Sequence, residues 1–458
     1  MNGLLKGVLA ACGGAVGAEV VRRAVFSGGQ PRYEPWERPP YQDFPNKVLI
    51  LGGGFAGYTA AKQLCKRTRH RDDVGVMVIS RENFFTFWPM LAGCISSDID
   101  TKNVAQPLRR ALIREGASFR RAEVESIDLQ NQSVTADGRE FPYDHLIVAL
   151  GAEPAYFGIP GVKEHAISIK GIGAAEEIRN RVIERYEETT LARGEVPDSH
   201  LTFVVIGGGA TGVEVAAELH ALVHDILAPD YPNINPYRVK IVLVDSNDMI
   251  LKELDPALRR TARKKLADLQ IEVHSKVKAK EITAEKVILS DGRVLSTANA
   301  IWTAGARASE KLDDMPLPSD ERRGLKVDAN MLVEGHENVW GVGDCAANIE
   351  EDGKLVPPNA QAAVQQGKAV ARNVLAAIDG GELRPFDYKP LGQLVEMGSD
   401  FAVNQVMSVK FSGFIAALFW RATYLYKLES PQSRARIAAD WLLDLFFDPA
   451  VTQIRSHE

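Results

Sequence analysis

The sequence contains little cysteine, no excess of positive charge and no long apolar run. Its four cysteines, Cys12, Cys65, Cys94 and Cys345, are far apart, and none has the C-x-x-C spacing of metal sites and redox pairs. We therefore expect reduced thiols, no disulfide framework and no metal site. The net charge of -6 provides no basic field for nucleic acid. No uninterrupted apolar stretch approaches the roughly 18 residues that span a bilayer.

The chain of 458 residues is long enough for two or three domains, and its most informative stretch is residues 47–61. Apolar residues 48–51 predict a buried strand, and Gly52, Gly54 and Gly57 have the spacing of a G-x-G-x-x-G turn. In such a turn the glycines let the chain reverse, approach a pyrophosphate and pack a helix closely on the strand. Phe55 and Ala56 open that helix, whose free N–H groups would meet phosphate. These residues predict a dinucleotide site.

The predicted second strand, residues 74–79, ends without the acidic side chain that usually holds the ribose hydroxyls. Ser80 and Arg81 follow it and are the candidate adenosine contacts, with Glu82 as an alternative. The aromatic stretch at 84–91 favours either a hydrophobic plug between domains or a wall beside a flat ring system. Another apolar strand ends at Gly151, a further candidate cofactor contact.

A second fingerprint follows the apolar strand at 201–206. Gly207, Gly209 and Gly212 repeat the glycine spacing, with Thr211 at the start of a helix predicted over 213–223. The repetition indicates two bound dinucleotides, or one plus a relic. The next strand, 239–244, ends in Asp245, whose carboxylate could accept from both ribose hydroxyls and repel a 2'-phosphate. This favours NADH over NADPH; the alternative is a solvated aspartate in a turn.

Residues 338–346 predict a short strand followed by Asp344, which could bind a ribityl hydroxyl. A helix starting near Asn359 would point its positive end at a flavin carbonyl. This segment returns the chain to its first domain. The pattern therefore predicts an α/β fold of two Rossmann-like dinucleotide-binding domains, the second inserted in the first.

The two ends of the chain carry different membrane signals. Apolar residues recur at helical spacing from 411 to 428, and a second helical stripe after Pro431 includes Ile437, Trp441, Leu442, Leu445 and Phe446. Both stripes are too short to span, so we expect amphipathic helices lying on a lipid surface. The alternative is that these faces meet another subunit or cover the core. Residues 4–18 favour a membrane-associated helix, a cleaved targeting segment or a disordered end.

Taken together, these motifs resemble type II NADH:quinone oxidoreductases, a family of flavoproteins with two dinucleotide-binding domains. The resemblance spans about residues 46–450 and lies in GGGFAG (52–57), NFFTFWPML (83–91), GGGATGVEVAAEL (207–219), WTAG (302–305), GVGDCA (341–346), AQAAVQQGKAVARN (360–373) and MGSD (397–400). It implies FAD in the first domain and NADH in the second. It also implies hydride transfer from NADH to FAD, then transfer of two electrons to a membrane quinone without proton pumping.

The resemblance implies roles for particular residues. Glu214 would lie near nicotinamide and flavin as a positioning or proton-handling carboxylate, and Gln361 and Gln365 would lie where the flavin meets the quinone channel. Gly305 would be a cofactor contact. The alternatives are a helix cap or surface charge for Glu214 and a solvated helix face for the two glutamines. Ala210 departs from the family pattern, which often has proline there.

The expected organisation is a tail and linker (1–45), an FAD-binding domain (46–165 and 325–390), an NADH-binding domain (166–324) and a membrane-associating C-terminal region (391–458). We expect a homodimer at the cytoplasmic face of a bacterial inner membrane, or alternatively at a mitochondrial inner membrane. The rival functions are a redox sensor or interaction protein of the apoptosis-inducing-factor type, and another quinone reductase of the same fold.

Overall fold

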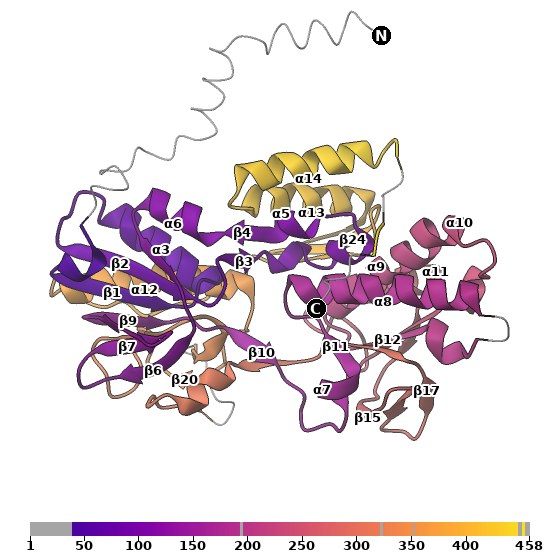
Figure 1. Ribbon diagram of the computed structural model, residues 1–458, viewed down its shortest axis with the longest axis horizontal. Helices are drawn as coiled ribbons and strands as arrows, with labels where there is room; N and C mark the ends of the chain where they lie inside the picture. The colour runs from indigo at the N-terminus through magenta and orange to yellow at the C-terminus, as the bar shows by residue number, and fades with distance from the viewer. Residues whose placement is uncertain (1–38, 193–195, 321–323, 351–352, 448–450, 454–458) are drawn as a thin grey trace, which may run out of the picture.

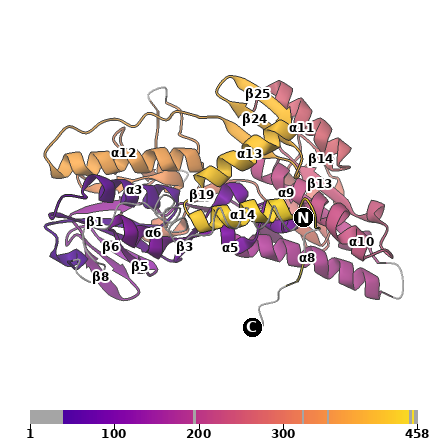
Figure 2. The same cartoon turned by 90° about the horizontal axis from the view of Figure 1, so that it is seen from above.

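The computed structural model describes residues 39–192, 196–320, 324–350, 353–447 and 451–453, so the segment at 4–18 lies outside the described residues. Two lobes, each built on a parallel sheet, lie side by side, and the C-terminal helices lie across the region between them (Figures 1 and 2). The α/β class with Rossmann-like parallel sheets is confirmed.

The first sheet has five parallel strands in the order β21-β9-β1-β2-β5. They are β1 (Asn46–Leu51), β2 (Val74–Ser80), β5 (Ser118–Arg121), β9 (His145–Val148) and β21 (Val339–Gly341). Residues 48–51 of β1 are fully buried, which explains their unbroken apolar run, since a central parallel strand is covered on both faces. The strands expected at 48–51 and 74–79 are confirmed.

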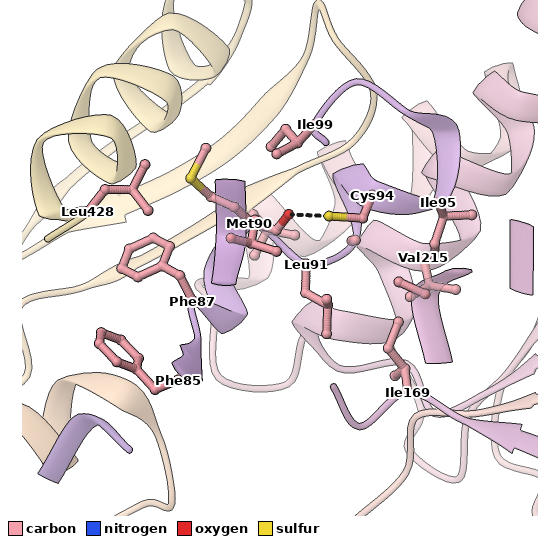
Figure 3. Close-up of a cluster of buried hydrophobic side chains, with 14 of the residues drawn as sticks. Phe85, Phe87, Met90, Leu91, Cys94, Ile95, Ile99, Ile169, Val215 and Leu428 are labelled. Atoms are coloured by element: carbon pink, nitrogen blue, oxygen red, sulfur yellow. Dashed lines mark hydrogen bonds between the residues drawn. The ribbon is translucent and has the colours of Figure 1, made fainter. Parts of the chain in front are cut away.

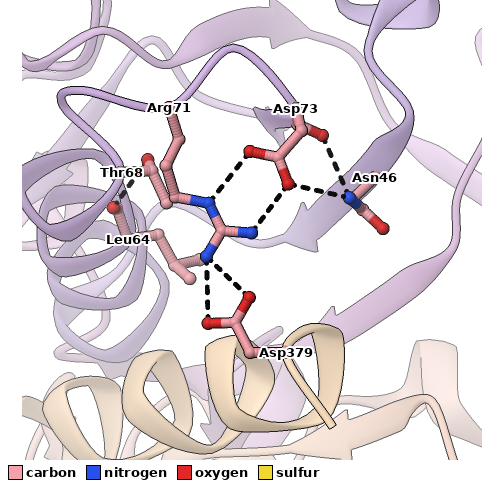
Figure 4. Close-up of polar contacts among 6 residues, drawn as sticks. All are labelled: Asn46, Leu64, Thr68, Arg71, Asp73 and Asp379. Carbon is pink, nitrogen blue, oxygen red and sulfur yellow. Dashed lines mark hydrogen bonds and ion pairs between the residues drawn. The ribbon is translucent and has the colours of Figure 1, made fainter.

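Two helices cover one face of this sheet in close contact, α3 (Phe55–Arg67) and α12 (Ala360–Ile378). A side chain at Gly367 of α12 would place its Cβ only 2.6 Å from the carbonyl oxygen of Ala56, so glycine permits the contact. The C-terminal end of α12 is tied to the first lobe by an ion pair (Figure 4). Arg71 donates to both carboxylate oxygens of Asp379, at 2.7 and 2.9 Å, and to Asp73 just before β2.

The second sheet has the order β11-β18-β12-β13-β14, again all parallel. Its strands are β11 (Ala166–Ser168), β12 (Thr202–Ile206), β13 (Lys240–Val244), β14 (Glu272–His274) and β18 (Asn299–Trp302). Its long helices are α8 (Ile172–Leu191), α9 (Ala210–His220) and α11 (Pro256–Asp268). The helix expected at 213–223 begins earlier and continues as a π-helix (Ala221–Leu227).

All strands of the second sheet lie between β9 and β21 in the sequence. The chain crosses between the lobes twice, through β10 (Ala152–Pro154) and β19 (Ala306–Ala308), which pair antiparallel. Each lobe also carries a three-stranded antiparallel sheet: β6 (Val124–Asp128), β7 (Ser133–Ala136) and β8 (Arg139–Pro142) in the first, β15 (Ala279–Ile282), β16 (Lys286–Leu289) and β17 (Val294–Ser296) in the second.

Short elements complete these lobes. They are β3 (Phe84–Thr86), β4 (Ala105–Pro107), β20 (Leu325–Lys326), β22 (Ala346–Ala347), α4 (Gly93–Ser96), α5 (Thr101–Val104), α6 (Leu108–Glu115), α7 (Val162–His165) and α10 (Ala228–Asp230).

The C-terminal region forms an antiparallel sheet, β23 (Gln393–Glu396), β24 (Ala402–Val406) and β25 (Val409–Gly413), followed by α13 (Phe414–Lys427) and α14 (Pro431–Leu443). The expected start of the first helix at 411 is wrong. Phe411 belongs to β25. Its ring packs against Phe419, with centroids 5.3 Å apart, so an apolar residue is needed at a position that also fits the helical spacing. Leu445 and Phe446 likewise follow the end of α14. Within the described residues, no helix is long and apolar enough to cross a bilayer.

Candidate functional site

The first glycine turn, between β1 and α3, has room for a ligand and little room for side chains. Gly52 has φ +103°, and a Cβ there would lie 2.2 Å from the carbonyl oxygen of Ala149. A Cβ at Gly57 would lie 2.0 Å from the carbonyl oxygen of Gly52. At Gly54 nothing lies within 4 Å of that position, so space is open at the N-terminus of α3. The donor set and the space fit a pyrophosphate.

The turn between β12 and α9 repeats this arrangement. Gly207 has φ +122°, a Cβ at Gly212 would lie 1.8 Å from the Gly207 carbonyl oxygen, and the space at Gly209 is open. Thr211 is exposed in the first turn of α9. The second cradle therefore fits a second dinucleotide by the same geometry.

Asp245 lies against this second cradle rather than in solvent. Its side chain is only 5% exposed, and a Cβ at Gly208 would meet its Oδ2 at 2.4 Å. Its Oδ1 accepts from the Asn247 side chain at 3.0 Å and backbone N–H at 3.2 Å. One carboxylate oxygen is thus committed to the turn, and the other lies beside the glycine loop.

At the end of β2, the side chain of Ser80 lies beside the first cradle. The Oγ of Ser80 would lie 3.1 Å from a Cβ at Gly53, so this hydroxyl lies against the glycine turn. Arg81 and Glu82 are exposed, with their charged atoms 3.8 Å apart.

A cavity of about 150 Å³ opens beside the first cradle, at the double crossing between the lobes. Gly343, Asp344 and Gln366 line it, together with Ala152 and Ala306. The Gly343 N–H donates to the Oε1 of buried Gln366 at 2.6 Å, which joins the loop after β21 to α12. Burial raises the pKa of Asp344. Sequence reasoning missed Gln366, although it follows Gln365 directly.

Gln361 and Gln365 lie on one face of α12, as their spacing predicted, and both contact the same stretch of backbone. Gln361 donates to the Gly392 carbonyl at 2.6 Å and accepts from the Leu391 N–H at 3.1 Å. Gln365 donates to the Lys389 carbonyl at 2.8 Å and accepts from its N–H at 3.0 Å. The two amides hold the extended segment 389–392 against the start of α12.

Glu214 lies among buried acidic side chains instead of on a helix surface. Its Oε1 accepts from the Glu396 N–H at 3.4 Å, and burial raises its pKa to about 8. Burial also raises the pKa of Glu218, which accepts from the Ser96 hydroxyl, to about 7. The pKa of Glu396 rises for the same reason.

Arg421 places a positive charge beside this acidic cluster. Arg421 of α13 has its Nε 3.4 Å from Glu396 and its Nη2 3.4 Å from Asp98, and Trp441 of α14 donates to Asp98 at 2.9 Å. Sequence reasoning missed Glu218, Glu396 and Asp98 because they come from α9, β23 and the loop before α5. Among the residues that the structure describes, no group of three or more His, Cys, Asp or Glu is arranged to hold a metal ion.

The aromatic stretch at 84–91 forms the plug that was one of its two interpretations (Figure 3). Phe85 and Phe87 are buried in the cluster that contains Val215 of α9 and Leu428. The Phe85 ring lies 5.5 Å from Phe55 in an edge-on contact. Trp88 is 39% exposed, and Phe84 is half-buried.

Comparison with known proteins agrees with this geometry. Residues 46–367 match the family of pyridine nucleotide-disulphide oxidoreductases. A probable NADH dehydrogenase of Dictyostelium discoideum is 31% identical, covering 88% of this chain and 90% of its own. The type II NADH:quinone oxidoreductase Ndh of Mycobacterium tuberculosis is also 31% identical, covering 90% of each chain.

Among solved structures, NDH2 from Plasmodium falciparum in complex with NADH superposes with a TM-score of 0.80. That match covers 89% of this chain and 99% of the other, and at 19% identity it supports the fold alone. The chain belongs to the pyridine nucleotide-disulphide oxidoreductase family and, within it, to the type II NADH:quinone oxidoreductases.

Proposed function

We propose that this chain is an NADH:quinone oxidoreductase that moves hydride from NADH to FAD and then two electrons to a membrane quinone, without pumping protons. The observation that carries the proposal is the pair of glycine cradles, one on each parallel sheet, with the Asp344 cavity beside the first. The names of the relatives, which include an NADH dehydrogenase and an NADH:quinone oxidoreductase, support the same reaction.

The first lobe has the groups that FAD needs. The cradle of Gly52, Gly54 and Gly57 would hold the pyrophosphate, with the N–H groups at Phe55 and Ala56. Asp344 would accept from a ribityl hydroxyl, and Ser80 would contact the adenosine half. Gly151, with φ +73°, has open space at its Cβ position. When bound, FAD supplies the hydride-accepting ring and the two-electron chemistry.

The second lobe would hold NADH. Gly207, Gly209 and Gly212 would bind its pyrophosphate, with Thr211 beside them, and Asp245 its ribose. Gly305, with φ +71° near the lobe crossing, would let the backbone approach the nicotinamide end. Asp245 would discriminate against NADPH because its carboxylate would face a phosphate.

At the junction the protein orients groups and handles protons. Glu214 carries its proton at neutral pH because burial raises its pKa to about 8, so it can hold a proton at its Oε atoms near the acceptor. Gln361 and Gln365 would fix segment 389–392 as one wall of the quinone channel. Phe85 and Phe87 exclude water from the region between the lobes.

We propose the division of the chain into an FAD-binding domain (46–165 and 325–390), an NADH-binding domain (166–324) and a C-terminal region (391–458). The C-terminal region would seat the enzyme peripherally on a lipid surface as a homodimer. The enzyme would bind at the cytoplasmic face of a bacterial inner membrane or, alternatively, at a mitochondrial inner membrane.

The membrane proposal rests on apolar side chains that remain uncovered. We define the C-terminal apolar surface as the exposed residues Phe414, Ile415, Leu418, Phe419, Tyr426, Leu442, Leu443, Leu445, Phe446 and Phe447. Contiguous exposed apolar side chains of this kind mark an interaction site. The opposite sides of the same helices are core, since Trp420, Leu428 and Ile437 are buried. The proposal therefore concerns the outer sides alone.

The deciding experiment follows the absorbance of the purified protein. Flavin bands should bleach on addition of NADH and return on addition of a soluble quinone, with one quinone reduced per NADH. A protein without flavin bands would contradict the proposal. Bleaching that air or a quinone does not reverse would instead indicate a redox sensor of the apoptosis-inducing-factor type.

A further inference from the structure

Lys170 lies between β11 and α8, at the entrance to the second lobe, and reaches back to the cofactor cavity. Its Nζ donates to the carbonyl oxygen of Ala152 at 3.2 Å and lies 5.6 Å from the centre of the Trp88 ring. Ala152 and Asp344 both line the cavity beside the first glycine cradle. No sequence motif singled out this lysine.

The surroundings of Lys170 differ from those of an ordinary surface lysine. Its side chain is open to solvent, yet burial by the surrounding protein lowers the pKa of its ammonium group. The two facts agree if the ammonium lies in a recess that solvent enters. Two carboxylates act on it, since the charges of Asp344 and Glu153 both oppose the lowering of its pKa. In turn, the charge of Lys170 opposes the rise that burial causes in the pKa of Asp344.

The Asp344 carboxylate gives the cavity a negative charge, so binding of an anionic ligand requires a nearby cation. A flavin dinucleotide is an anion because of its pyrophosphate, and the Asp344 carboxylate beside the first cradle would repel that charge unless a cation screened it. Arg307 also lines the cavity, but its guanidinium is paired with Glu310. Among the residues that the structure describes, Lys170 is therefore a cation that the ligand can meet beside Asp344.

We propose that Lys170 is a binding residue for the flavin dinucleotide, held in place by the Ala152 carbonyl and the Trp88 ring so that its ammonium group faces the anionic ligand beside Asp344. The inference rests on the proposed function, because it needs FAD in the first lobe. The competing explanation is that Lys170 merely ties the lobe crossing to Trp88. Removing its charge would then leave cofactor retention unchanged.

The test measures FAD release from the purified holoenzyme, followed by the rise of FAD fluorescence after dilution. Lys170→Met removes both charge and hydrogen bond, while Lys170→Gln can still donate to Ala152 and removes only the charge. Lys170→Arg keeps the charge. Lys163→Met, at an exposed lysine on α7, is the matched control.

We expect Lys170→Gln and Lys170→Met to release FAD about tenfold faster than the wild type, the usual size for one lost charge-assisted contact. Lys170→Arg and Lys163→Met should stay within about threefold. If Lys170→Met does not fold, as judged by circular dichroism, Lys170→Gln decides. Release from Lys170→Gln at the control rate overturns the inference. A wild type that binds FAD but does not reduce quinone would contradict the proposed function and leave this inference standing.

Discussion

The backbone N–H of Glu396 lies 3.4 Å from the carboxyl Oε1 of Glu214. Glu396 is on β23 of the C-terminal sheet, and Glu214 is on α9, two residues after Gly212 of the second glycine cradle. The C-terminal region therefore orients a carboxyl group beside the proposed nicotinamide site, in addition to presenting an apolar surface.

The proton on Glu214 makes stability depend on pH. The folded chain keeps this proton up to about pH 8, whereas the ordinary pKa is 4.5. Between these values the folded state binds more protons than the unfolded state, so this group makes stability fall as pH rises. Glu214→Gln removes that contribution. The melting temperature of the holoenzyme should drop less between about pH 6 and about pH 9 in this variant than in the wild type. Glu382→Gln, an exposed control, should follow the wild type; equal drops in all three proteins would count against the buried proton.

Arg421 bridges the side chains of Glu396 and Asp98. Arg421→Met should destabilise the holoenzyme by about 3 kcal/mol, because it leaves the buried Glu396 and the half-buried Asp98 without their cation. Adding Glu396→Gln should recover part of that loss, since glutamine, unlike Glu396 with its raised pKa, carries no charge at any pH. Denaturant unfolding of the single and double variants measures both effects, with Lys427→Met on the same helix as the control. A double variant no more stable than Arg421→Met would show that packing on Trp441, not charge, explains the loss.

Asp245 should set the choice of nucleotide. Asp245→Asn removes the charge that would face a 2'-phosphate while keeping the side chain's size. The ratio of kcat/KM for NADPH to that for NADH should rise roughly tenfold, which corresponds to about 1.4 kcal/mol. Steady-state kinetics with both nucleotides check this, and Asp248→Asn, three residues away, serves as the control. A ratio equal to that of the wild type would remove Asp245 from nucleotide choice.

Gln365 should matter to the second half-reaction. Gln365→Leu removes both hydrogen bonds to Lys389 and loosens segment 389–392 beside the proposed quinone channel. Reoxidation of the reduced enzyme by quinone should slow, while reduction by NADH stays near normal. Stopped-flow absorbance separates the two steps, and Lys368→Leu, on the exposed side of α12, is the control. Equal slowing of both steps would indicate general damage to α12.

The C-terminal apolar surface should be required for lipid binding. Ile415 and Leu418 are 68% and 55% exposed, so Ile415→Asp with Leu418→Asp should leave the fold and FAD content intact. When the proteins are sedimented with anionic vesicles, the double variant should stay in the supernatant. The control Val294→Asp, on β17, should pellet with the vesicles as the wild type does. Substitution is a better test than truncation, because α13 and α14 also carry core residues. Retained vesicle binding with a changed oligomeric state would make this surface a subunit contact.

Features within one continuous stretch could be predicted from the sequence, whereas contacts between distant stretches could not. Gly52 to Gly57 and Gly207 to Gly212 follow their strands directly, so spacing alone located both cradles. The pairs Glu214 with Glu396 and Gly343 with Gln366 join separate elements, and no local period reports them. Phe411 shows the opposite error, because a tertiary contact with Phe419 imitated a helical repeat.

The position of α13 and α14 late in the sequence, far from the first-lobe residues they cover, has a consequence for biosynthesis. Trp420, Leu428 and Ile437 complete the main core, and β21 at residues 339–341 completes the first sheet next to β9. Because synthesis runs from the N-terminus, Phe87 is made long before Trp420, Leu428 and Ile437, which pack in the same core. The first lobe cannot finish folding before these later segments have left the ribosome, and until then the growing chain exposes apolar surface.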